Sequence, residues 1–350
     1  MNRRQLLHTG AAATALAGLA PPAFAAPGTH AELDKLFTTF VEEGLDLQPE
    51  GATSLGLDFG TRAHQKSELT DRSLAASAHQ NALTITQLAR LEAFDAGALS
   101  ATDQLNRDVV LYSFRQQVAS AKRFKFAGGG AGNPYVLNQM GGSAFHDLPD
   151  FLDSQHSIET RSDADAYIAR LASFGTAIGQ DTEQARHDAA LGVTPPDFVI
   201  DGTLKQLRGL RDTPPHKSVL VQSLIRRTTE KKIEGDWAAR ATTIYEELIT
   251  PALTSQVAVL EELRKTATHD AGVWRLPDGD AYYRASVNFW TTTDLSGDQI
   301  HATGLKLVHE LSARADEKMR AQGLTRGTVG ERFRALYDDP KYRYPITDDG

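Results

Sequence analysis

The sequence predicts a mainly α-helical protein, a large assembly of long packed helices with at most a short strand or hairpin. Three observations support this fold class. Apolar residues recur at helical spacing over most of the chain, Ser or Thr capping signals precede several helical stretches, and no stretch keeps strict alternation. Of the 350 residues, 41% are hydrophobic, which is enough to build a packed core.

Three long helices are predicted in the N-terminal part of the chain, over residues 31–43, 67–94 and 101–126. Gly44 is expected to stop the first helix, because glycine is a common residue after a helix end. Ser100 and Asp103 resemble a capping box that opens the third helix. By their spacing, four residues of this third helix share one face: Leu105, Val109, Tyr112 and Gln116.

Glycine and proline divide the middle of the chain. A loop is expected from Gly128 to Pro149, and a helix begins near Ser162. The apolar face of this helix consists of Ile168, Leu171, Phe174 and Ile178. A shorter helix, 197–210, lies between two Pro-Pro pairs, because proline is excluded from helix interiors.

A long helix is predicted over 236–267, with a bend at Pro251, which lacks the N–H that a mid-helix residue donates. Four residues are in register along it: Trp237, Ala241, Ile244 and Leu248. Residues 272–279 indicate a turn, with a short strand possible at 273–276. Capping boxes at Ser296 and Thr328 then open two further helices.

The first 25 residues are predicted to be a twin-arginine-type signal peptide. Arg3 and Arg4 precede a weakly apolar stretch of small residues, and an A-x-A site ends at Ala25. Cleavage near Ala25 would make the protein periplasmic or secreted, with the twin-arginine export machinery as a partner. The alternative is an amphipathic N-terminal helix. No shift in composition divides residues 26–350, which are predicted to form one helical domain or part of one.

Composition excludes several classes of function. The chain has 45 acidic and 37 basic residues, a net charge of −8, so the broad positive surface that nucleic acid requires is not expected. With no cysteine, the chain has no disulfides, thiolate metal ligands or cysteine nucleophile. Beyond the signal, no apolar run is long enough to predict a stable membrane span.

Motifs for catalysis are missing from the sequence. An HExxH zinc site needs two histidines at i and i+4, but Ala313 follows His309-Glu310 where the second histidine would stand. Ser143 lacks the closing glycine of a G-x-S-x-G nucleophile turn. We therefore predict no catalytic residue and no metal ligand in these 350 residues.

Two clusters leave alternatives open. Asp147, Asp150 and Asp153, with His146 and His156 nearby, could hold a cation, or they could be acids that complement a helix N-terminus. The second cluster is aromatic and consists of Trp274, Tyr282, Tyr283, Phe289 and Trp290. It could line a cleft, where tyrosine offers a hydrogen bond and an apolar face, or it could pack in the core. The basic run from Arg226 to Lys232 is expected to be a solvated face.

The chain resembles the DUF885 family of bacterial exported proteins. The matching segments are 133–142 (NPYVLNQMGG), 147–152 (DLPDFL), 272–283 (GVWRLPDGDAYY), 291–296 (TTTDLS), 299–301 (QIH) and 339–344 (DPKYRY). The family is similar to gluzincin-type zinc metallopeptidases, which are mostly helical around a long cleft. Its members are longer, and their HExxH-like signature lies in the C-terminal half.

The resemblance implies that this chain is the N-terminal part of an exported zinc-dependent peptidase acting on short peptides, and that the helical domain over residues 26–350 is incomplete at its C-terminus. It would form one side of the cleft, while the zinc ligands would lie outside this chain. The residues expected to contact the peptide substrate are Tyr282, Tyr283, Trp290, Asn138, Gln139 and His146. The alternatives are a non-catalytic helical periplasmic binding protein and, third, a scaffold that docks a partner.

Overall fold

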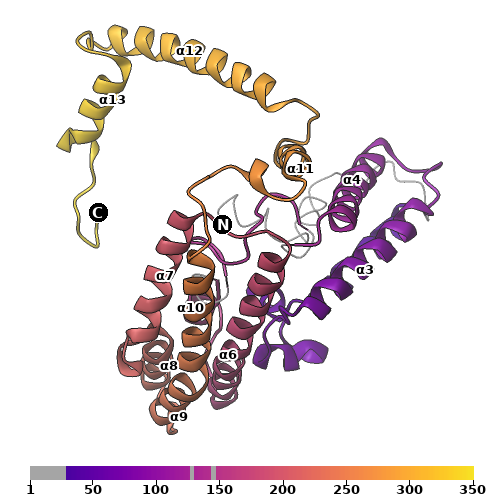
Figure 1. Cartoon of the computed structure of the whole chain (residues 1–350), viewed down its shortest axis with the longest axis vertical. Coiled ribbons are helices and arrows are strands. Elements are labelled where there is room, and N and C mark those ends of the chain that lie inside the picture. The colour runs from indigo at the N-terminus through magenta and orange to yellow at the C-terminus, as the bar shows by residue number, and fades with distance from the viewer. Residues whose placement is uncertain (1–28, 127–129, 143–146) are drawn as a thin grey trace. The chain divides into compact units, whose positions relative to one another are not determined.

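The computed structural model describes residues 29–126, 130–142 and 147–350 (Figure 1). The proposed signal peptide and His146 lie outside the described residues. The prediction of a mainly α fold is confirmed. The described part of the chain contains no strand, and its one isolated bridge joins Asn138 and Gly141. The short strand considered at 273–276 is a 3-10 helix, Val273–Arg275.

The chain forms two compact units, one ending at Phe289 and the other comprising Trp290–Gly350. The α-helices of the first unit are α1 (Thr29–Asp46), α2 (Pro49–Ser54), α3 (Leu74–Glu92), α4 (Ala101–Arg123), α5 (Leu148–Ser154), α6 (Arg161–Ala190), α7 (Asp197–Asp212), α8 (Val219–Glu230), α9 (Trp237–Ile244), α10 (Thr250–Arg264) and α11 (Gly279–Thr291), whose last two residues belong to the second unit. Shorter elements are η4 (Gly60–Ser67), η7 (Pro215–Lys217), η8 (Tyr245–Ile249) and η9 (Val273–Arg275). The second unit holds α12 (Gly297–Ala321), α13 (Val329–Asp338) and η10 (Pro340–Tyr342).

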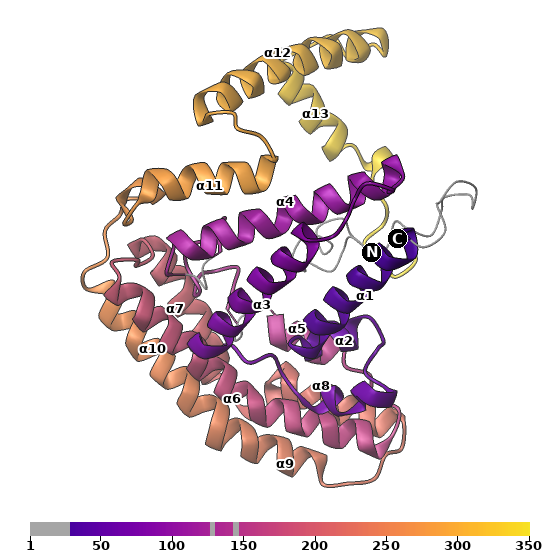
Figure 2. The ribbon, with the colours of Figure 1, turned by 90° about the vertical axis from the view of Figure 1, so that its right-hand side faces the viewer.

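The core of the first unit is built around α6 and α10, which lie side by side (Figures 1 and 2). The Thr160 hydroxyl accepts a hydrogen bond from the Asp163 amide and the Asp163 carboxylate accepts one from the Thr160 amide, so a capping box starts α6. The predicted apolar face of α6 is buried, with Leu171, Phe174 and Ile178 all at 0% exposure. Helices α5, α7, α8 and α9 and the turn η8 contribute further buried residues to this apolar cluster.

The predicted register changes near Pro251. Instead of a simple bend, residues Tyr245–Ile249 form a π-helix, whose wider turn accommodates the missing proline N–H. The extra residue in the turn exposes Leu248 and buries Ile249 in its place, contrary to the predicted register. Gly175 of α6 faces this turn, and a Cβ there would lie 2.8 Å from the Leu248 carbonyl oxygen. The glycine therefore allows α6 and the π-helix to approach closely.

Helices α1, α3 and α4 form a second apolar cluster around Leu33, Leu91 and Leu111. Two predictions are wrong here. Gly44 lies inside α1, and α3 begins only after its N-cap Ser73. The face that the spacing defined on α4 points to solvent, with Leu105, Val109 and Tyr112 all exposed, and Leu111 and Val118 instead pack inward.

A buried arginine connects the first segment of the chain to α6. Arg170 is fully buried and donates hydrogen bonds to four neutral acceptors: the Glu68 and Gln65 carbonyls, the Thr53 hydroxyl and His156 Nδ1. His156 Nε2 in turn lies 3.0 Å from the Asp163 carbonyl, so its ring nitrogens are both engaged. Burial lowers the pKa of His156 to about 4. The imidazole is therefore neutral beside the guanidinium.

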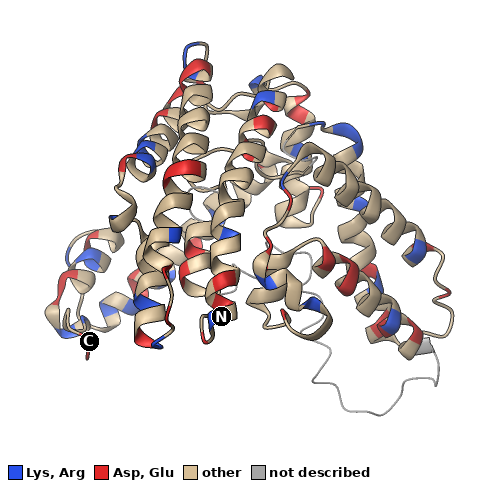
Figure 3. Ribbon diagram, turned by 90° about the horizontal axis from the view of Figure 1, so that it is seen from below, with Lys and Arg blue, Asp and Glu red and all other residues tan. Residues whose placement is uncertain are grey.

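Acidic and basic residues are interleaved along the helices (Figure 3). The predicted solvated run on α8 is partly correct, because Arg226 pairs with Asp153 and Lys231 with Glu159 at the surface. Arg227 differs: it reaches inward to the Leu152 and His156 carbonyls and lies over the Tyr167 ring. None of the described helices is long and apolar enough to cross a membrane.

Candidate functional site

Two segments that the sequence analysis selected, 133–142 and 272–283, lie together in the first unit. The Gly132 amide donates to the Ser286 hydroxyl at 3.1 Å. Arg275 donates to the Tyr135 hydroxyl at 2.9 Å and to the Thr194 carbonyl at 2.5 Å. One guanidinium thus connects the loop, the short helix η9 that precedes α11, and the segment between α6 and α7, which makes this region the candidate functional site.

Tyr282 anchors the site from inside. It is 1% exposed, and its ring lies 5.0 Å from the Phe124 ring and 5.2 Å from the Phe126 ring. These rings belong to a small apolar cluster with Val193, Leu276 and Ala281. Burial raises the pKa of Tyr282 to about 12, so the hydroxyl stays protonated. These contacts give Tyr282 a packing role, and its contact with substrate stays a prediction.

Tyr283, the next residue on α11, is 49% exposed. Adjacent helical positions are separated by about 100°, so one tyrosine packs inward while the other reaches solvent. Phe289 and Trp274 are also exposed. The Tyr112 hydroxyl on α4 donates to Asn288 Oδ1 at 2.7 Å and so connects α4 to α11. Trp290 is exposed as well and belongs to the second unit.

Asn138 and Gln139 serve the loop itself. The Asn138 amide donates to the Tyr135 carbonyl, and its Oδ1 accepts from the Met140 amide, so the side chain closes its own turn. Gln139 lies over Gly202 of α7, where a Cβ would be 2.0 Å from Gln139 Nε2. The structure therefore brings Asn138 and Gln139 near the Tyr135–Arg275 pair. Whether they contact substrate stays a prediction.

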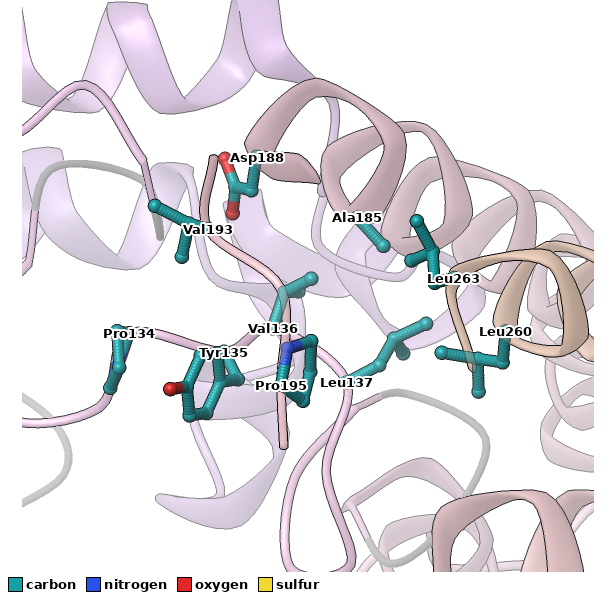
Figure 4. A pocket seen from close by; sticks show the side chains of 10 residues that line it. All are labelled: Pro134, Tyr135, Val136, Leu137, Ala185, Asp188, Val193, Pro195, Leu260 and Leu263. Carbon is teal, nitrogen blue, oxygen red and sulfur yellow. The ribbon is translucent and has the colours of Figure 1, made fainter. Parts of the chain in front are cut away.

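Behind the loop lies a small hollow (Figure 4). Its volume is about 10 Å³, which is room for a water molecule and not for a substrate. Tyr135, Val136 and Leu137 of the loop line it together with Asp188 of α6 and Leu260 of α10. Asp188 is buried and accepts hydrogen bonds from Gln184 Nε2 at 2.7 Å and His187 Nδ1 at 3.0 Å. The cavity is a packing defect behind the loop rather than a binding pocket.

The residues that the structure describes do not form a metal centre. No group of three His, Asp or Glu side chains among them could hold an ion. His156, which the sequence placed beside a possible carboxylate group, faces Arg170 with both nitrogens engaged. Asp153 pairs with Arg226 instead. The described residues therefore do not provide a ligand set that fits zinc.

A family model described as "Bacterial protein of unknown function (DUF885)" matches residues 49–350. No curated protein matches the chain. Among solved structures, "The crystal structure of the putative lipoprotein from Colwellia psychrerythraea" aligns with a TM-score of 0.81 and 22% sequence identity. The alignment covers 92% of this chain and 56% of that one, so this chain spans just over half the length of the solved relative. At this identity the likeness establishes the shared fold.

Proposed function

The chain belongs to the DUF885 family, and from this premise we propose that it is part of an exported zinc-dependent peptidase acting on short peptides. Its role would be to supply one wall of the substrate cleft. The signal-like first 25 residues support periplasmic or secreted localisation through the twin-arginine machinery. The solved relative is described as a lipoprotein, a class of exported protein, and this description also supports export.

The observation that carries the proposal is the packing of loop 133–142 against the start of α11. Two segments about 140 residues apart in sequence are joined by Arg275 and Tyr135, and the buried Tyr282 ring fixes α11 beneath them. A side chain on a rigid element can position a ligand better than one on a free loop. Tyr283 therefore stands on a fixed support with its ring and hydroxyl available to a peptide.

The proposal places the zinc ligands outside the described residues, because these residues hold no suitable group. In the whole protein the metal would supply the activated water. The residues of this chain would bind and orient the peptide. Tyr283 would donate a hydrogen bond to a peptide carbonyl and cover an apolar side chain with its ring.

The test compares the whole natural gene product with the 350-residue chain. We expect the whole protein to bind one zinc ion and to cleave short peptides, and the 350-residue chain to do neither. Zinc content by plasma emission spectrometry and cleavage of a tripeptide mixture would be measured on both. Stoichiometric zinc and turnover by the 350-residue chain alone would contradict the proposal. Peptide binding by a whole protein without zinc or turnover would favour the non-catalytic binding protein.

Tyr283→Phe in the whole protein tests the wall itself. Loss of the hydroxyl should lower kcat/KM about tenfold, because one hydrogen bond to the bound peptide is removed. The melting temperature should not change, since the side chain is half exposed. Phe59→Leu, at an exposed position outside the site, is the matched control. Unchanged turnover in Tyr283→Phe would remove Tyr283 from the peptide-binding residues.

A further inference from the structure

A second hollow lies in the first unit, outside the two segments that form the candidate site. It is a groove of about 480 Å³ between α3, the end of α4 and the end of α6, whose helices are seen in Figure 2. This volume falls within the range of roughly 300–1,000 Å³ that is usual for small-ligand sites. The groove is thus large enough to hold a ligand, unlike the water-sized cavity behind the loop.

The shape of the groove comes from small side chains on α3. Ser77, Ala78 and Ala82 lie along the groove at helical spacing and leave the surface of the helix open. Leu74 and Ile85 continue the same line and are exposed at 41% and 45%. The groove therefore presents an apolar surface to solvent, next to the buried Phe124 of the opposite wall.

The charged residues of the groove are all basic. Lys122, in the last turn of α4, and Lys125, two residues beyond the end of α4, line it, and no acidic side chain does, although the whole chain carries a net charge of −8. Lys125 Nζ donates to the Ala121 carbonyl at 3.0 Å and keeps further protons for a ligand. No carboxylate in the described part of the chain pairs with Lys122. An anionic group would meet complementary charge at this end of the groove.

Polar groups along the groove decide between two anionic ligands. Ser77 lies on the α3 side of the groove and His187 on the α6 side. The amide nitrogen of Gln184 is held by Asp188 and its side chain is buried, whereas His187, which faces Asp188 through Nδ1, is 36% exposed and keeps Nε2 for a ligand. An acyl chain would cover these groups without offering hydrogen bonds, which costs free energy. A peptide presents N–H and C=O groups at the same intervals as its side chains. The arrangement therefore suits a short peptide with a free carboxylate better than a fatty acid.

We infer that the groove between α3, α4 and α6 binds the C-terminal carboxylate of a short apolar peptide. The carboxylate contacts Lys122 and Lys125, and the apolar side chains of the peptide lie along Leu74, Ala78 and Ile85. Binding here requires neither zinc nor turnover. The inference therefore holds or fails independently of the proposed peptidase activity.

Isothermal titration calorimetry on the full chain tests the inference with three probes: N-acetyl-Leu-Ala-Leu, its C-terminal amide, and decanoate. The free-acid peptide should bind, and its amide should bind at least about tenfold more weakly, because the charge-assisted contacts are lost. Lys122→Met should weaken binding of the free acid about tenfold and reduce its dependence on salt. Lys205→Met, at an exposed lysine of α7, is the matched control and should change nothing.

Ala82→Trp provides a second test that does not involve charge. Ala82 is exposed, so the larger side chain should fill the groove without unfolding α3, and it should abolish binding of the free-acid peptide. Equal affinity for acid and amide, or no binding of either, would overturn the inference. Tighter binding of decanoate than of the peptide would assign the groove to acyl carboxylates and overturn it as well. A Lys122→Met variant that melts earlier yet binds normally would show that Lys122 only stabilises the end of α4.

Discussion

Helices α6 and α12 are both long, and both begin with a capping box, but they differ in what they bury. Thirteen of the 30 residues of α6 are buried. Of the 25 residues of α12, all of which the structure describes, Met319 alone is buried. Four apolar side chains of α12 are instead exposed: Leu305, Leu307, Val308 and Leu311. Capping and spacing are therefore sufficient to form either helix, whereas packing depends on what the rest of the chain supplies.

The two regions also use buried arginine differently. Arg170 in α6 is surrounded by neutral acceptors, and burial lowers its pKa to about 10. Arg332 of α13 is 5% exposed and pairs with the Asp316 carboxylate of α12, while it also donates to the Leu324 carbonyl at 2.9 Å. The first unit is thus held by an apolar core with a polar connection, and the α12–α13 corner is held by an ion pair.

The largest expected difference between the regions follows from truncating one apolar side chain in each. Phe174→Ala should cost about 3–5 kcal/mol of unfolding free energy, because the buried ring leaves a cavity in the core. Leu307→Ala should change it by less than about 0.5 kcal/mol, since the side chain is half exposed. Urea unfolding of both variants measures the contrast. A large loss in Leu307→Ala would show that the apolar face of α12 is covered in solution.

Acid should weaken the first unit through His156. The folded pKa is about 4, below the ordinary value of 6.5, so the unfolded chain binds the proton first as the pH falls. The contribution of the neutral His156 to the free energy of unfolding is therefore fully present above pH 6.5 and declines between pH 6.5 and 4. Below that window the free energy of unfolding is lower by roughly 3 kcal/mol. The urea midpoint measured from pH 8 to 4 checks this window. His156→Gln, which can keep an acceptor and a donor but does not titrate, should flatten the profile; an unchanged profile would assign the acid sensitivity elsewhere.

Local signals predicted the elements better than their contacts. Capping residues and proline pairs placed the starts of α6, α12 and α13, and both ends of α7, close to where they are observed, because the hydrogen bonds that start a helix form within a few residues. The spacing on α4 also identified a shared face correctly. It could not show that Leu105 and Val109 face solvent, because burial depends on the neighbouring helices rather than on spacing.

Sequence reasoning could predict only part of the candidate site, because contacts between distant segments, like burial, are not encoded in local spacing. Segments 133–142 and 272–283 were both selected, but the hydrogen bond between Tyr135 and Arg275 joins residues 140 positions apart, which no local pattern encodes. Two neighbouring tyrosines on α11 gave no sign of which would be buried. The insertion of a π-helical turn at Tyr245–Ile249 likewise depends on the close approach of Gly175, which lies 70 residues earlier. A proline late in a helical stretch was its only local signal.

Glycines sharpen the comparison, because the same Gly→Ala substitution should lower the free energy of unfolding at one position and raise it at another. Gly175→Ala should destabilise by about 1–3 kcal/mol, because its Cβ would overlap the Leu248 carbonyl. A Cβ added at Gly179, one turn later on α6, would meet no atom within 4 Å beyond its own stretch of helix, so Gly179→Ala should stabilise by up to about 1 kcal/mol. Gly304 of α12 is equally open and should behave like Gly179. Urea unfolding of the two α6 variants and amide exchange of the α12 variant measure whether each substitution stabilises or destabilises its helix. A stabilising Gly175→Ala would refute the close approach of Gly175 to Leu248.

The smallest expected effect concerns the two capping boxes. Ser296→Ala and Thr160→Ala each remove one hydroxyl acceptor, which ordinarily costs about 1 kcal/mol. The two boxes differ in the residue at the third position of the helix, which is Gln299 in α12 and Asp163 in α6. The Asp163 carboxylate also accepts from the Glu159 amide and pairs with Lys66, so α6 keeps its other N-terminal contacts when Thr160 is changed. Ser296→Ala should therefore speed amide exchange in the first turn of α12 more than Thr160→Ala does in α6. Equal acceleration would mean that the cap alone, and not its tertiary connections, determines the stability of a helix start in this protein.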